Sequence, residues 1–79
     1  MPPTPRKVRV TFHSQHLVDG QPVRMQAIAH TPSRVYHAHC QQADGVWVGE
    51  VPGAGIIFEG DTQEQLKQSF EQAVLAHAG

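Results

Sequence analysis

Apolar and polar residues alternate along the N-terminal part of the chain, and this period of two is typical of half-buried β-strands. One alternating segment covers residues 8–13 and a second covers residues 23–29, although Ile28 falls on the polar side. The Asp19-Gly20 pair between the two segments favours a tight turn. We therefore expect a β-hairpin over residues 7–30, preceded by a flexible, proline-rich tail over residues 1–6.

Three further strands are predicted after the Thr31-Pro32-Ser33 breaker. They cover residues 34–42, 46–51 and 56–58, and the turns between them contain Asp44-Gly45 and Pro52-Gly53. The strand over residues 46–51 is partly apolar on both faces, which is typical of a strand inside a sheet rather than at its edge.

The hydrophobic period changes after Asp61-Thr62, where a segment without glycine or proline runs to Gly79. An apolar stripe at helical spacing predicts an amphipathic helix, and it consists of Leu66, Phe70, Ala73, Val74 and His77. Thr62 and Gln65 have the spacing of a helix-capping box. The predicted fold class is therefore α+β: an antiparallel sheet, made of the N-terminal hairpin and a three-stranded meander, with one C-terminal helix packed on one face. We expect a single domain over residues 1–79, whose β-β-β-α core covers residues 34–79.

A single helix stripe covers one face of a sheet, so the opposite face has no cover from this chain. Tyr36 and Trp47 lie on neighbouring predicted strands and are either core residues or anchors of an interface on that open face. Leu75 lies opposite the helix stripe. We predict an interface formed by Tyr36, Trp47, Val48 and Leu75, with a protein partner or with a second copy of the chain in a homodimer or higher oligomer.

The second half of the chain carries a recognisable succession of motifs. Glu50-Val51-Pro52 ends a strand, Pro52-Gly53 makes a turn, and Gly60-Asp61-Thr62 opens the amphipathic helix. In this order and spacing, the chain resembles the core of HicB-type antitoxins over residues 35–77. The resemblance implies a partial RNase H-like sheet without catalytic carboxylates, in a protein that binds and blocks a small HicA-type ribonuclease toxin. At the start of the helix we expect Gly60 to adopt the positive φ that entry from a strand can require.

Two parts of the chain differ from that family. HicB-type antitoxins usually continue into a DNA-binding segment, and none follows the predicted helix, so we do not expect operator binding. The hairpin over residues 7–30 has no counterpart in the family, and it either extends the sheet or occupies a surface that family members offer to the toxin. The alternative function is therefore a stand-alone oligomeric protein, structural or small-ligand-binding, that reuses the HicB-like core without a toxin partner.

Composition narrows the classes of function further. The formal net charge is −1 with neutral histidines, and no dense basic stripe is present, which argues against nucleic-acid binding. Cys40 is the single cysteine, so the sequence predicts no disulfide scaffold and favours a reducing, cytoplasmic location. No apolar run approaches the roughly 20 residues that a membrane-spanning helix needs, so we expect no membrane partner.

Histidine is unusually frequent, with six residues in the chain. His37 and His39 point to the same side of their predicted strand, because side chains two apart on a strand share a face. They are candidate metal ligands if His13 or His30 supplies a third nitrogen. Alternatively, they are exposed polar residues, and their number suggests association that depends on pH.

Neither the carboxylates nor the cysteine forms a recognisable catalytic motif. Glu50 and Glu59 flank the Pro-Gly turn and form either a paired acid site or part of a surface edge. Cys40 follows His39 on the same strand, and adjacent strand residues point to opposite faces, so Cys40 is interpreted as a small core residue. We therefore expect no catalytic residue, no enzymatic activity and no cofactor.

Overall fold

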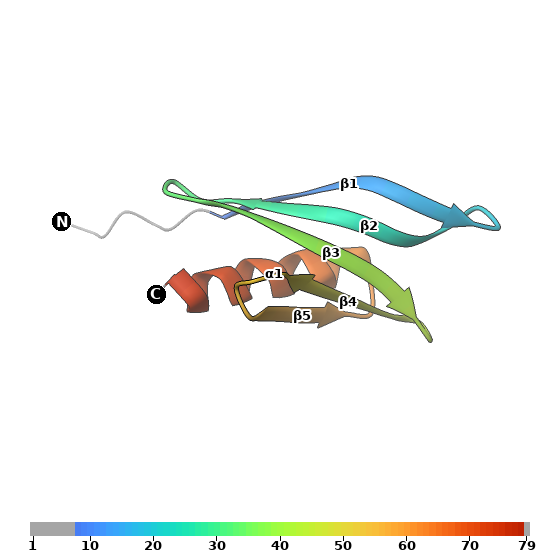
Figure 1. The fold of residues 1–79 in the computed structure, drawn as a ribbon. Coiled ribbons are helices and arrows are strands. Elements are labelled where there is room, and N and C mark those ends of the chain that lie inside the picture. Colours follow the sequence, from blue (N-terminus) through green and yellow to red (C-terminus); the bar gives the residue numbers. More distant parts are fainter. Residues whose placement is uncertain (1–7, 79) are drawn as a thin grey trace.

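The computed structural model describes residues 8–78, which fold into a five-stranded antiparallel sheet and one C-terminal helix (Figure 1). The elements are β1 (Arg9–Val18), β2 (Gln21–His30), β3 (Val35–Ala43), β4 (Val46–Val51), β5 (Ile56–Gly60) and α1 (Gln63–Ala78). The strands lie in the sheet in the order in which they occur in the chain, so β4 is internal, as predicted. The α+β class is confirmed, while the tail predicted over residues 1–6 lies outside the described residues.

The N-terminal hairpin belongs to the same sheet as the meander. Strand β2 pairs with β1 on one side and with β3 on the other. Both Asp-Gly turns have the left-handed backbone that two-residue hairpin turns need, with φ of 52° and 78° at Asp19 and Gly20 and of 52° and 79° at Asp44 and Gly45. The hairpin therefore extends the sheet, which was one of the two possibilities that the sequence left open.

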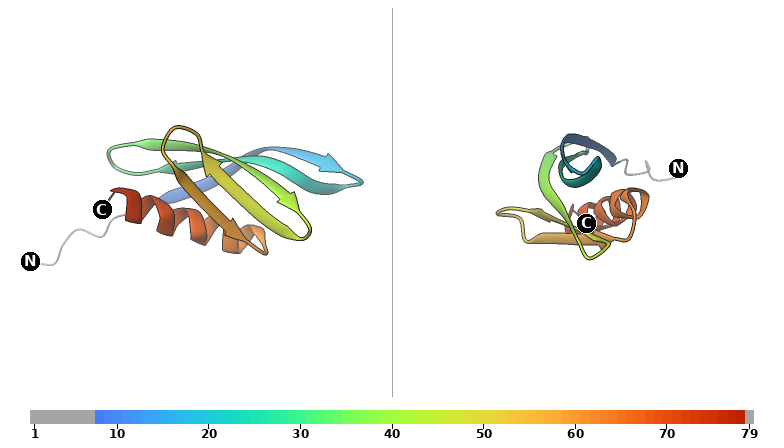
Figure 2. Two further views of the ribbon diagram at one scale, coloured as in Figure 1. Left: turned by 60° about the horizontal axis from the view of Figure 1, so that its bottom comes forward. Right: turned by 90° about the vertical axis from the view of Figure 1, so that its right-hand side faces the viewer.

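The sheet curves around α1, which covers one of its faces (Figure 2). The helix packs chiefly on β5 and also reaches β1, β2 and β4. Leu66, Phe70 and Val74, which belong to the predicted apolar stripe, are its fully buried side chains. The Phe70 ring stacks on the Phe58 ring of β5 with 4.2 Å between the centroids. All five strands add buried side chains to this single core, which lies between the helix and the sheet.

The start of α1 has the predicted capping box. The Gln65 backbone N–H donates to Thr62 Oγ1 at 3.1 Å, and the Asp61 N–H donates to Gln65 Oε1 at 2.9 Å. The expectation for Gly60 is wrong, because positive φ values occur at other glycines and not there. A Cβ atom at Gly60 would instead lie 2.5 Å from the backbone nitrogen of Leu66. The glycine lets the first turn of the helix lie directly against the end of β5.

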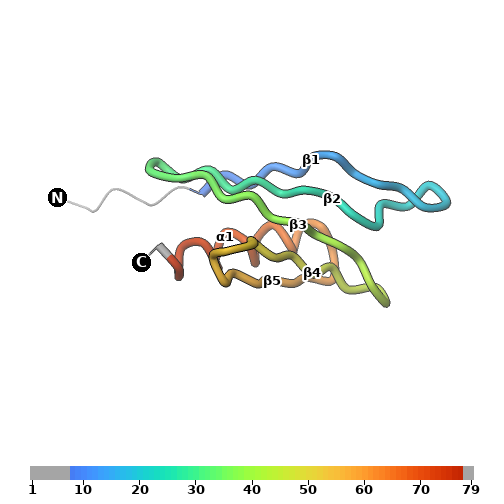
Figure 3. The backbone as a smooth tube through the Cα atoms, viewed as in Figure 1, coloured from blue at the N-terminus to red at the C-terminus, as the bar shows by residue number. Residues whose placement is uncertain are grey.

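Strands β1 and β2 continue beyond the rest of the sheet, and their connecting end projects past the helix (Figure 3). We call residues 14–23 the hairpin arm, whereas Arg24 pairs with Gln41 of β3 and belongs to the main part of the sheet. The arm begins at an irregularity in β1, where Ser14 has a φ of 52° and the pairing with β2 shifts between His13 and His16. None of residues 14–23 belongs to the buried core, so the arm is held by the pairing of its two strands.

Candidate binding surfaces

Tyr36 and Trp47 were predicted as interface residues on the open side of the sheet, and the structure corrects this placement. Both side chains point toward the helix and are buried, with 6% and 3% of their surface exposed. Tyr36 shares its side of β3 with Ala38 and Cys40, as strand alternation requires. Its ring packs edge-on against the ring of His77, with 6.1 Å between the centroids. Both aromatic residues are therefore part of the core, which was the other interpretation of the sequence.

Val48 and Leu75, the other two predicted interface residues, lie in different places. Val48 is exposed on the open side of the sheet, whereas Leu75 is half-buried on α1. Leu75 lines a shallow hollow between the helix and the start of β1, together with Val8, Arg9 and Pro32. The role of both residues in an interface stays a prediction.

One exposed surface is the side of the sheet that faces away from α1, and we call it the open face. Alternation along the strands places two groups of side chains there. The apolar ones are Ile28, Val35, Ala43, Val46, Val48 and Ile57, and the polar or charged ones are Arg9, Thr11, His13, His16, Arg24, Gln26, His30, His37, His39, Gln41, Glu50 and Glu59. Val48 and Ile57 are 38% and 67% exposed, so the open face offers apolar contacts within a polar surround.

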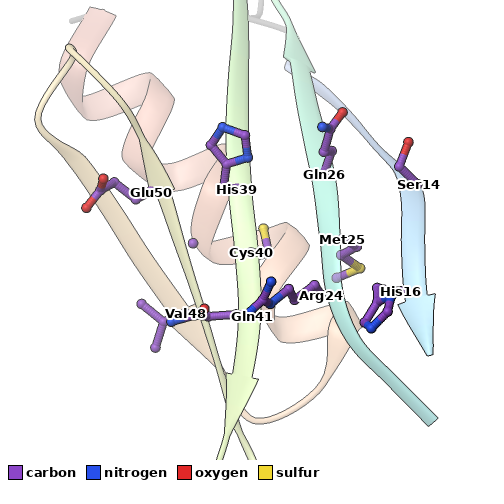
Figure 4. Close-up of a pocket in the computed structure, with 11 residues that line it drawn as sticks. Ser14, His16, Arg24, Met25, Gln26, His39, Cys40, Gln41, Val48 and Glu50 are labelled. Atoms are coloured by element: carbon purple, nitrogen blue, oxygen red, sulfur yellow. The ribbon is translucent and has the colours of Figure 1, made fainter. Parts of the chain in front are cut away.

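The strand registers align the residues of the open face in rows across the sheet. One row runs His16, Arg24, Gln41, Val48 and Glu59 from β1 to β5. The neighbouring row runs His13, Gln26, His39, Glu50 and Ile57. Four side chains of the first row and three of the second line a hollow in the open face (Figure 4): His16, Arg24, Gln41, Val48, Gln26, His39 and Glu50.

Charge is segregated across these rows. On the open face, Arg24 lies on β2 and the carboxylates Glu50 and Glu59 lie on β4 and β5. Arg9, at the start of β1, lies at the edge of this face and also borders the hollow beside α1. Strand β3 separates the two groups and carries His37 and His39 on this face. The open face therefore has a basic half and an acidic half.

The hairpin arm is the second exposed surface, and the sequence analysis did not identify it. Leu17 and Val18 at the end of β1 are 53% and 49% exposed. They immediately precede the Asp19-Gly20 turn, where a hairpin has no second layer to cover its side chains. Two consecutive apolar residues beside a turn dipeptide were the signal that could have indicated this surface.

The histidines of β3 do not form a metal site within residues 8–78, where no group of three His, Cys, Asp or Glu residues has a suitable arrangement. Across the neighbouring strands, His37 faces Ile28, and His39 faces Gln26 and Glu50. Both histidines are exposed, as the polar interpretation of the sequence expects.

The structure also places the remaining candidates for chemistry. Cys40 is buried, and this burial raises the pKa of its thiol from 9.0 to about 11, so the thiol is protonated at neutral pH. Glu50 faces Ile57, and Glu59 faces Val48, so the two carboxylates are not cross-strand partners. Both are exposed, in agreement with the surface interpretation.

These features define an α+β fold in which an antiparallel β-meander is covered by a helix on one face only. Comparisons with protein-family models, curated proteins and solved structures gave no match. Within residues 8–78, no helix is both long and apolar enough to span a membrane.

Proposed function

We propose that the chain is a non-catalytic protein-binding module of the HicB-antitoxin type, whose partner is a small HicA-type ribonuclease toxin. The observation that carries the proposal is the hairpin arm, which presents two exposed aliphatic side chains at the end of a projecting hairpin. Apolar side chains held outside the core in this way are available for contact with another protein. The resemblance to HicB-type cores over residues 35–77 supports the choice of partner class.

The arm suits a role in which it enters a groove or cleft of the partner. Its strands are paired with each other, so binding orders little additional backbone, and a smaller entropy loss opposes association. Leu17 and Val18 would be the first side chains to reach the partner because they adjoin the turn at the tip. In a toxin complex, the arm would block access of RNA to the ribonuclease.

The test mixes the purified chain with a panel of HicA-type toxins and measures RNA cleavage and complex formation. We expect inhibition by the wild-type chain, and at least tenfold weaker inhibition by a variant that combines Leu17→Asp and Val18→Asp. Gln21→Asp is the matched control, since it adds a charge at an exposed arm position without removing an apolar side chain. Failure of the folded wild-type chain to bind or inhibit any member of the panel would overturn the proposal.

A further inference from the structure

The open face is self-complementary in charge. From β1 to β5, arginines on the first two strands give way to carboxylates on the last two. The Arg24 and Glu59 positions lie in the same row and are three strands apart, which corresponds to about 14 Å at the usual strand spacing. The two side chains are thus too distant to pair within one chain, and each is available to a partner.

From this arrangement we infer that the open face binds a second copy of the chain, sheet against sheet, about a two-fold axis that runs parallel to β3. Rotation about such an axis places β1 and β2 of one copy over β5 and β4 of the other. The basic half of each copy then meets the acidic half of its partner, and every contact occurs twice, as in any isologous interface. Arg24 lies over the partner's Val48 and beside the partner's Glu59. Its aliphatic stem packs on the valine, and its guanidinium contacts the carboxylate.

The charge distribution also selects this axis over the other possible one. A two-fold axis across the strands would place β1 over its own copy and β5 over its own copy. Arginines would then face arginines and carboxylates would face carboxylates, and like-charge contacts across an interface cost several kcal/mol. Only the axis parallel to the strands brings opposite charges together. Both axes keep the strands of the two sheets nearly aligned, as in packed sheets, so the charges alone select between them.

The dimensions of the open face suit a small interface. Five strands at about 4.8 Å and the six residue steps from Val35 to Gln41 at about 3.3 Å give a surface of at most roughly 20 Å by 20 Å, because the sheet curves around α1. Such a surface buries about 800 Å² counted over both copies, which is below the standard size of specific interfaces and within the range of weak, transient contacts. We therefore expect a reversible dimer, which weakens at high salt because its charge pairs are screened.

The assignment of a second copy to the open face rests on the proposed protein-binding function. Its test uses Arg24 and Glu59, which are distinct from Leu17 and Val18 at the tip of the arm. Arg24→Glu places two like-charge contacts in each dimer, and so does Glu59→Arg. Sedimentation velocity should show at least a tenfold weaker dimer for each single variant. Both positions are exposed, so unchanged circular dichroism and melting temperature serve as the folding control.

Mixing the two single variants tests directly whether Arg24 pairs with Glu59 of the other copy. When they are mixed, a heterodimer contains two opposite-charge contacts, because Glu at position 24 of one chain meets Arg at position 59 of the other, and the remaining pair is native. We expect the mixture, and also the Arg24→Glu/Glu59→Arg double variant, to recover dimerisation to within about threefold of the wild type.

Three results would overturn the inference. The first is that the wild-type chain stays monomeric at high concentration. The second is that the Arg24→Glu and Glu59→Arg variants each dimerise as well as the wild type. The third is that their mixture forms no heterodimer. A monomeric wild type whose toxin inhibition is lost on Arg24→Glu and kept in the Leu17→Asp/Val18→Asp variant would assign the open face to the toxin instead. Loss of inhibition only in the Leu17→Asp/Val18→Asp variant, with dimerisation intact, would separate the two surfaces.

Discussion

Substitution of Gly49 by alanine is a sensitive test of how closely the core is packed. It lies on the helix-facing side of β4, opposite Phe58 of β5. A Cβ atom built at Gly49 would overlap the ring of Phe58, and that ring is held from its other side by stacking on Phe70. The ring therefore has little freedom to move away, and we expect Gly49→Ala to destabilise the fold.

The sign of this effect is informative because two contributions oppose each other. Replacing glycine by alanine inside a strand normally stabilises by about 0.5–1 kcal/mol, since the unfolded chain loses conformational freedom. Forcing an extra methyl group into a packed core costs about 1–3 kcal/mol. The net expectation is a loss of about 1 kcal/mol or more, which corresponds to a fall in melting temperature of about 4–8 °C for a domain of this size.

Thermal unfolding of Gly49→Ala, Phe58→Leu and the double variant provides the control. Leucine lacks the outer ring atoms that the new methyl group would meet, so Gly49→Ala should be neutral or stabilising in the Phe58→Leu background. Equal destabilisation in both backgrounds would refute the steric explanation. A stabilising Gly49→Ala in the wild-type chain would show that the Phe58 ring does not lie over this glycine.

Three further predictions concern other parts of the fold. Thr62→Ala removes the hydroxyl that accepts the Gln65 N–H and should cost about 1 kcal/mol; an unchanged melting temperature would contradict this. Burial raises the pKa of Cys40 from 9.0 to about 11, so the thiol ionises more readily in the unfolded chain. Stability, measured by urea unfolding, should be constant below pH 9 and fall by about 2–3 kcal/mol as the pH rises from about 9 to 11, and Cys40→Ala should remove this fall. Replacement of residues 15–24 by an Asn-Gly turn should leave a cooperatively melting core, because this segment holds no buried core residue; loss of cooperative melting would show that the arm supports the core.

Local signals in the sequence were sufficient for the elements and their order. Alternation identified β1, β2 and β3, although Ile28 interrupts it in β2, and the Asp-Gly pairs marked both two-residue turns. The capping box at Thr62 located the start of the helix, whose backbone bond from Leu66 N–H to the Thr62 oxygen is present at 2.9 Å. These features depend on neighbouring residues, so a single sequence carries them.

The placement of the two aromatic residues could not be decided in the same way. Alternation states that Tyr36 and His37 face opposite sides, but it does not state which side the helix covers. That choice depends on how the curved sheet closes around Leu66 and Phe70, which is a property of contacts distant in sequence. Gly60 shows the same limit, since its requirement arises from close approach of the helix and not from its own backbone angle.

The segregation of charge on the open face follows from the topology as much as from the composition. In a meander, the spatial order of strands equals their order in the chain, so a change from arginine to glutamate along the sequence becomes a change across the sheet. A fold that interleaved early and late strands would mix the same residues and produce no basic and acidic halves. Rotation about an axis parallel to the strands reverses their order, and it therefore turns a one-directional change in charge into a self-complementary surface. The same reversal explains why the pairing of Arg24 with Glu59 can be tested between chains, whereas no contact within one chain can imitate it.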